Sequence, residues 1–119
     1  MAQRGCTTRH PRRIMATVEQ LFLHVRCHMP IFIADHRLKS FDAWIEVFRA
    51  NPPPPVGHWR LMRAADDPNR IFVIGEVAAS DVKTVKEFLA SERMQAVFRQ
   101  VDTMSTAPIE FLLLDEVPV

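Results

Sequence analysis

The sequence predicts one α+β domain in which an antiparallel sheet carries its helices on one face. Apolar and polar residues alternate in several short segments, as in strands, and apolar residues recur three and four positions apart in others, as in helices. From Ile31 onward these segments follow the order strand, helix, strand, strand, helix, strand. This is the ferredoxin-like βαββαβ order, with a four-stranded antiparallel sheet.

Composition limits the classes of partner. The 119 residues suffice for one domain, or for one domain with a tail. The formal net charge is only +1, whereas a broad nucleic-acid surface needs clustered positive charge. No apolar run approaches the roughly 20 residues that span a bilayer. We therefore expect a cytoplasmic protein with no nucleic-acid or membrane partner, in which Cys6 and Cys27 stay reduced.

The N-terminal region divides into two parts. Residues 1–14 contain no acidic residue and no apolar periodicity, which predicts a disordered leader. Translation from Met15 and a basic nucleic-acid arm are the alternatives. In the extension at residues 15–30, helical spacing and strand alternation fit about equally well. A plausible capping box of Thr17 and Gln20 gives the helix a slight preference.

The domain proper, residues 31–119, begins with a strand and a helix. Side chains alternate along residues 31–38, as in a strand with two different faces. Ser40 is suited to cap a helix that begins near Phe41. This helix must end by Asn51, because four consecutive prolines follow. The apolar side of the helix consists of Phe41, Trp44, Ile45 and Phe48.

A hairpin, a helical region and a last strand follow. Residues 57–65 and 71–79 have the pattern of two strands, and the Asx and proline residues at 66–69 predict the turn between them. Ser80 or Asp81 caps the next helical region, Ser91 restarts it, and the last strand covers residues 109–115.

The strands are apolar on both faces of the predicted sheet. Neighbouring positions that fall on opposite faces are both apolar in all four strands: Phe32 and Ile33, Leu61 and Met62, Phe72 and Val73, Phe111 and Leu112. Helices that cover only one face would leave the other apolar face in water, which is unfavourable. A second copy of the chain is the simplest cover, so we expect a twofold homodimer.

The domain resembles a known superfamily over residues 31–114. The helix FDAWIEVF, Gly57 before the second strand, DDPNRIFVIGEV through the hairpin and FLASERMQAVF in the second helical region are similar to segments of the dimeric α/β-barrel superfamily, which includes the antibiotic-biosynthesis monooxygenase-like proteins. The resemblance implies that two protomers pack sheet to sheet into a barrel, each with a pocket between sheet and helices. It also implies a role among cofactorless oxygenases, isomerases and haem-degrading enzymes.

Candidate site residues lie within the apolar strands and the first helix. His36 could transfer a proton near neutral pH, or it could be a partly buried histidine bonded to a neighbour. His58 and Arg60 share one strand face and could converge with His36 on one pocket, where Arg60 would hold a carboxylate or phenolate. Alternatively, both lie at a sheet edge in water. Trp44 and Trp59 could stack on a flat ligand, although Trp44 has core spacing.

No cofactor or metal is predicted. Three glycines form no phosphate-binding loop, and His24 with His28 lacks further ligands. The first functional hypothesis is a homodimer that binds a small apolar or aromatic molecule, with His36, His58 and Arg60 as catalytic residues of a cofactor-independent oxygenase, isomerase or cyclase. The second is a non-catalytic binding or dimerising module in which the polar strand residues lie in the interface.

Overall fold

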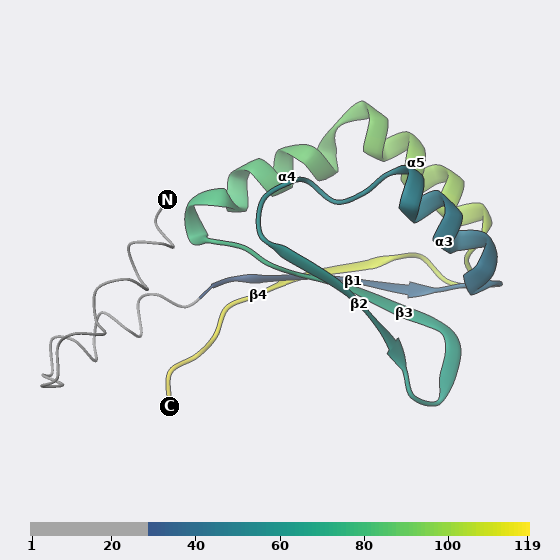
Figure 1. Ribbon diagram of the computed structural model, residues 1–119, viewed down its shortest axis with the longest axis horizontal. Helices are drawn as coiled ribbons and strands as arrows, with labels where there is room; N and C mark the ends of the chain where they lie inside the picture. Colours follow the sequence, from purple (N-terminus) through teal and green to yellow (C-terminus); the bar gives the residue numbers. More distant parts are fainter. Residues whose placement is uncertain (1–28) are drawn as a thin grey trace, which may run out of the picture.

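The computed structural model describes residues 29–119 of the protein (Figure 1). The elements are β1 (Ile31–Arg37), α3 (Phe41–Ala50), β2 (His58–Ala64), β3 (Asp67–Glu76), the short 3-10 helix η2 (Ala79–Asp81), α4 (Val82–Ala90), α5 (Glu92–Thr103) and β4 (Glu110–Leu114). The predicted order of strands and helices is confirmed. The predictions for residues 1–14 and 17–27, the two cysteines and the His24–His28 pair fall outside the described part of the chain.

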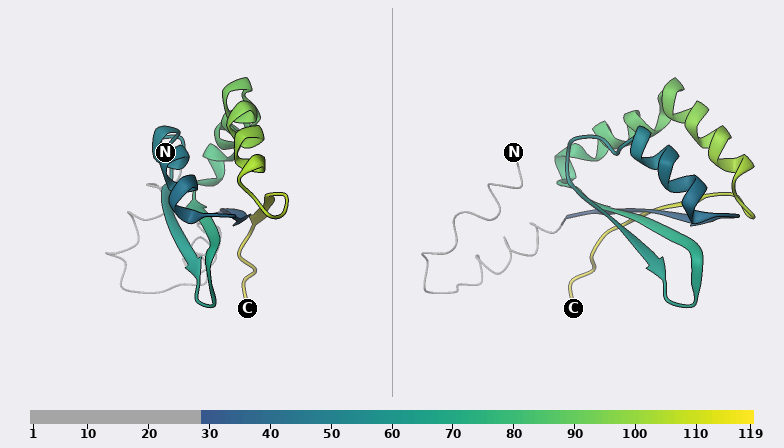
Figure 2. Two further views of the ribbon diagram at one scale, coloured as in Figure 1. Left: turned by 90° about the vertical axis from the view of Figure 1, so that its right-hand side faces the viewer. Right: turned by 45° about the vertical axis from the view of Figure 1, so that its right-hand side comes forward.

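The four strands form one antiparallel sheet in the order β2-β3-β1-β4. In the centre of the sheet, Ala34 of β1 lies between Val73 of β3 and Phe111 of β4. The helices α3, α4 and α5 lie over one face of the sheet, and no described element covers the other face (Figures 1 and 2). The fold is therefore the ferredoxin-like α+β fold that the sequence predicts.

Local sequence signals fix the position of α3. The Ser40 hydroxyl accepts a hydrogen bond from the backbone N–H of Ala43 at 3.4 Å, as an N-cap residue does. The backbone N–H of Phe41 donates to Oδ1 of Asn69 in β3 at 2.9 Å. The start of the helix is thereby attached to the sheet, and the helix ends just before the proline run.

The turn between β2 and β3 lies earlier than the sequence predicts. The Asx and proline residues indicate a turn at 66–69, but Ala64 already pairs with Asp67, so only two residues connect the strands. Asp67 Oδ1 accepts the backbone N–H of Asn69 at 2.9 Å. This local bond is usual in turns, and here it forms within the irregular start of a strand. The pattern is therefore correct for a hairpin and wrong for the position of its turn.

The core lies between the helices and the covered face of the sheet. Trp44, Ile71, Val77 and Val85 are its largest fully buried side chains. One cluster surrounds Trp44 near the end of β1, and a second contains Phe32, Val77 and Val85 near its beginning. Members of both clusters line the cavity described below.

The uncovered face of the sheet carries exposed apolar side chains between charged ones. Met62, Leu112 and Leu114 on this face are 50%, 51% and 43% exposed. Ile33 and Ile74 pair side by side at its centre. The prediction of a sheet that is apolar on both faces is confirmed.

A charged pair lies at one end of this face. Arg70 donates two hydrogen bonds to Asp35, from Nε to Oδ1 at 3.2 Å and from Nη2 to Oδ2 at 2.9 Å. Asp35 is only 6% exposed. The hydrogen bond from Arg70 holds the pKa of the Asp35 carboxyl below its ordinary value, despite the opposing effect of burial. The buried carboxylate is therefore compensated, and the apolar face contains no unpaired charge at this position.

Candidate functional site

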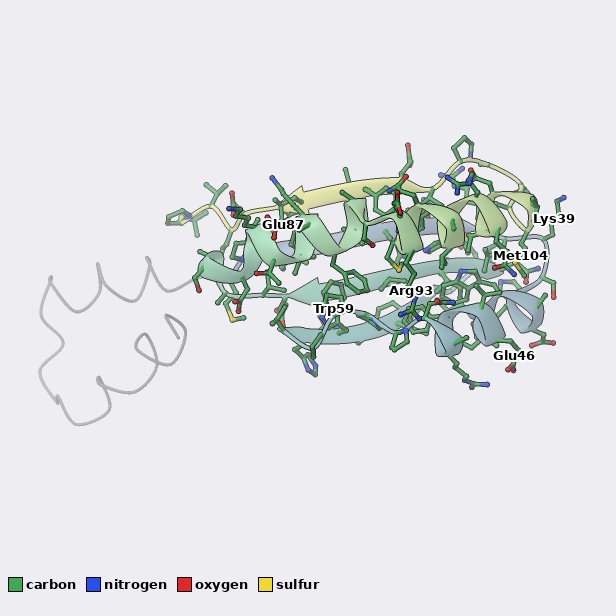
Figure 3. The ribbon with its side chains drawn as sticks, turned by 90° about the horizontal axis from the view of Figure 1, so that it is seen from above. Lys39, Glu46, Trp59, Glu87, Arg93 and Met104 are labelled. Carbon is green, nitrogen blue, oxygen red and sulfur yellow. The ribbon has the colours of Figure 1, made fainter. Side chains whose placement is uncertain are left out.

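A cavity of about 80 Å³ lies between the covered face of the sheet and the helices. The sheet and the helix layer are seen from above in Figure 3. Much of the cavity wall consists of aromatic rings, those of Phe32, Trp44, Phe48, Trp59, Phe88, Phe98 and Phe111. Apart from the two tryptophans, His36 and Asn51 are the polar side chains among the described wall residues, and no Asp, Glu, Lys or Arg takes part. The site is thus an apolar pocket with very few polar groups.

His36 reaches the cavity because of its place in β1. Strand alternation turns Asp35 and Arg37 to the uncovered face and His36 towards the helices. Its side chain is 5% exposed, and its ring lies 5.0 Å from the Trp44 ring, centroid to centroid. Within residues 29–119, His36 Nδ1 has no hydrogen-bond partner. Buried polar atoms are nearly always bonded, so an unpaired buried nitrogen of this kind is unusual.

Burial also determines the charge of His36. Removal from water lowers the pKa of His36 from 6.5 to about 4, and the neighbouring Asp35 carboxylate opposes this only in part. The imidazole is therefore neutral at pH 7. A neutral imidazole has one nitrogen that donates and one that accepts. It can form a hydrogen bond with an uncharged polar group without bringing a charge into the cavity.

The free energy of unfolding is expected to fall by about 3 kcal/mol between pH 6.5 and pH 4 because of His36. The unfolded chain binds a proton at His36 below pH 6.5, whereas the folded chain does so only near pH 4. The stability that depends on neutral, buried His36 is thus fully present above pH 6.5 and is lost as the pH falls to 4. Urea denaturation at pH 7 and pH 4 measures this loss of unfolding free energy. His36→Phe should flatten the profile in this window, and an unchanged profile would assign the loss to other groups.

The structure does not bring His36, His58 and Arg60 together. Phe32 of β1 and Trp59 of β2 both pair with Gly75 of β3, so the two strands place these residues on the same covered face. His36 shares that face. His58 and Arg60 alternate with Trp59 and lie on the uncovered face.

The predicted convergence is therefore wrong. Alternation within each strand is visible in the sequence, but the register between strands, which decides which faces coincide, is not. Arg60 instead lies 3.6 Å from the carboxylate of Glu76, with both side chains well exposed.

Both tryptophans line the cavity. Trp44 is 2% exposed and stacks on Phe48 at a centroid distance of 5.1 Å, so it is a core residue that also forms cavity wall. Trp59 lies against Gly75, where any Cβ would overlap the indole ring, and its N–H donates to the Val56 carbonyl at 2.7 Å. Trp59 therefore offers the cavity a ring face rather than a free donor. Contact of either ring with a ligand remains a prediction.

Several wall residues could not be found from the sequence. Phe88, Met94, Phe98 and Phe111 come from three different elements, and their spacing indicates only that each is apolar and inward-facing. Pro53 and Pro54 of the proline run also line the cavity, although the sequence marks them only as a connector. Sequence spacing carries no information on distances between elements, and no other signal in this chain does.

Two further findings concern residues 29–119 only. No group of three or more His, Cys, Asp and Glu side chains in this range is placed to hold a metal ion. No helix in this range is long and apolar enough to cross a membrane.

Comparison with known proteins gives matches among solved structures alone. No family model and no curated protein matches the sequence. An antibiotic biosynthesis monooxygenase structure aligns with a TM-score of 0.58 and 18% identity, over 76% of this chain and 100% of that one. Rv0793 from Mycobacterium tuberculosis aligns with a TM-score of 0.60 and 14% identity, over 76% of this chain and 97% of that one. A conserved protein from Methanosarcina mazei Go1 aligns with a TM-score of 0.61 and 8% identity, over 73% of this chain and 91% of that one.

These identities are low, so the likeness concerns the fold. It agrees with the resemblance in the helix and hairpin segments of the sequence. The described domain has a ferredoxin-like fold similar to that of the antibiotic biosynthesis monooxygenase structure.

Proposed function

We propose that the protein is a homodimer in which each copy binds a small, uncharged apolar or aromatic molecule in the cavity, through one hydrogen bond to His36. The observation that carries this proposal is the buried, neutral His36, whose Nδ1 has no partner among the described residues, in a wall that is mostly apolar. An apolar pocket with a few well-placed polar groups is the usual form of a small-molecule site.

The cavity wall supports an uncharged ligand. None of the described wall residues carries a formal charge at pH 7, and a charged group moved from water into such a pocket without a partner is strongly disfavoured. A hydroxyl or carbonyl group, by contrast, would form a hydrogen bond with the neutral imidazole of His36. The ligand class is therefore an apolar body with one neutral polar group.

The uncovered sheet face supports the dimer. Met62, Leu112 and Leu114 are among the exposed large apolar side chains, and contiguous apolar surface of this kind is typical of interaction sites. Packing two such faces together would form the dimeric α/β barrel that the family resemblance implies. His58 and Arg60 then belong to the interface region and not to the cavity.

Cofactor-independent chemistry on the bound molecule is the second candidate function. The likeness in fold to an antibiotic biosynthesis monooxygenase favours it, and His36 is the group that would accept a proton from the ligand. A pKa of about 4 makes His36 a weak base at pH 7. Binding is therefore proposed first, and oxygenase, isomerase or cyclase activity second.

Phenol and toluene, which differ by a hydroxyl and a methyl group of similar size, test the role of His36. We expect the wild-type protein to bind both in NMR titrations. His36→Phe should lower the ratio of phenol to toluene affinity by about tenfold, the equivalent of one hydrogen bond. His58→Ala is the matched control, because His58 lies on the other sheet face, and should leave the ratio unchanged. Failure of both compounds to bind, or an equal change in both variants, would contradict the proposal.

A further inference from the structure

An open groove adjoins the cavity along the edge strand β4. Its volume is about 540 Å³, and it lies between β4 and the outer sides of α4 and α5. Apolar side chains form most of its surface, including Leu89, Ala90, Ile109 and Leu113. Its polar residues, Lys86, Gln95 and Asp102, are all on the helices and exposed to solvent.

Four residues line both the groove and the cavity: Phe32, Leu89, Phe98 and Phe111. The rings of Phe98 and Phe111 are in edge contact, with their centroids 5.3 Å apart and their planes at 65°. This pair therefore lies where the two spaces adjoin.

The strand that carries Phe111 is weakly held. All five residues of β4 are exposed, Phe111 itself is 49% exposed, and among the described strands β4 pairs only with β1. Side chains and edges with few buried contacts rearrange at lower free-energy cost than a core does. Separation of the Phe98 and Phe111 rings would accordingly join the two spaces at a low free-energy cost.

The cavity by itself is small. An engineered protein cavity of about 150 Å³ holds one benzene molecule, and the cavity here has about 80 Å³, so even a single ring would displace side chains of the wall. A molecule that fills only this space would bury little apolar area. One that continued into the groove would bury much more.

We propose that the Phe98–Phe111 pair is the entrance to the cavity, and that cavity and groove together bind one elongated molecule. Its uncharged polar head bonds to His36, its apolar body passes between the two rings, and its far end lies along β4. This inference rests on the proposed function and specifies its ligand: an apolar body longer than a single ring, with a neutral hydrogen-bonding group at one end. A polar group at the outer end would stay hydrated beside the exposed helix residues.

A series of unbranched alcohols from butan-1-ol to decan-1-ol, measured by isothermal titration calorimetry on the full-length protein, tests the inference. Each buried CH₂ should raise affinity by about fourfold. If the groove is part of the site, the rise continues to the long alcohols. If another part of the chain or a second copy fills the groove, the rise stops after the first few carbons. That result overturns this inference and leaves the proposed function intact, whereas failure of every alcohol to bind overturns both.

Two variants separate binding in the groove from unspecific binding elsewhere. Leu113→Asp places a charge in the groove and should remove the gain of the long alcohols while leaving butan-1-ol affinity unchanged. Val117→Asp is the matched control, because Val117 is also an exposed apolar residue, at 76%, but lines neither space. Equal losses in the two variants would overturn the inference.

The entrance has its own kinetic test. Phe111→Ala removes one of the two rings and should raise the association rate constant of octan-1-ol several-fold. Stopped-flow tryptophan fluorescence can follow the binding, since Trp44 and Trp59 line the cavity. An unchanged rate constant in this variant would place the entrance elsewhere.

Discussion

Replacing Ile33 with glutamate is expected to convert the proposed homodimer into a monomer at micromolar concentration. Ile33 lies in the central strand β1, on the uncovered face, between Ile74 of β3 and Leu112 of β4. In a face-to-face dimer, each copy would bury one new carboxylate among apolar side chains. Such an unpaired charge costs several kcal/mol, so the dimer dissociation constant should rise by at least about 100-fold.

Sedimentation velocity would measure this change. Gln100→Glu provides the matched control, because it adds the same charge at an exposed position of α5 on the helix side. The far-ultraviolet circular dichroism of the Ile33 variant should stay native, since its side chain points away from the core. A dimer of unchanged affinity would show that this face is not the interface.

Trp44→Ala is expected to lower the free energy of unfolding by about 3–5 kcal/mol. Trp44 is 2% exposed. Its ring centroid lies 5.0 Å from that of His36, 5.1 Å from that of Phe48 and 6.1 Å from that of Phe41. Truncation removes these contacts and enlarges the existing cavity, which Trp44 lines. A domain is stable by only about 5–15 kcal/mol in total, so this loss is a large fraction.

Urea denaturation at pH 7 tests this expectation. Trp44→Phe retains an aromatic ring and should lose much less stability than Trp44→Ala. A loss below about 1 kcal/mol in the alanine variant would fall outside the range expected for a buried aromatic residue, and would show that the α3–sheet contact does not depend on this ring.

The fold was predictable because its signals are local. Alternation along β1, the Ser40 cap and the proline run each act within a few residues of one another, and together they place a strand, a helix start and a helix end. A local signal of the same kind gave the wrong position for the hairpin turn. Asp67 and Asn69 form their local hydrogen bond at the start of β3 rather than in a turn.

The candidate site depended on information that is not local. His36 was identifiable as a histidine on an apolar strand face, but its unpartnered Nδ1 follows from how α3 packs on β1. Whether His58 lies on the same sheet face as His36 depends on the register of β2 against β3. Phe111 has the spacing of a core residue, yet it is half exposed, and β4 is the edge strand of the sheet that the described residues form.

Strand β1 carries two sets of side chains that serve different purposes. Phe32, Ala34 and His36 point to the covered face and line the cavity, while Ile31 and Ile33 alternate with them on the uncovered face, although Ile33 also borders the cavity. For protein engineering, one seven-residue strand therefore offers two nearly independent libraries. Randomising the first set would test the proposed ligand binding, and randomising the second would test the proposed self-association, so each proposed property could be selected while the other is held constant.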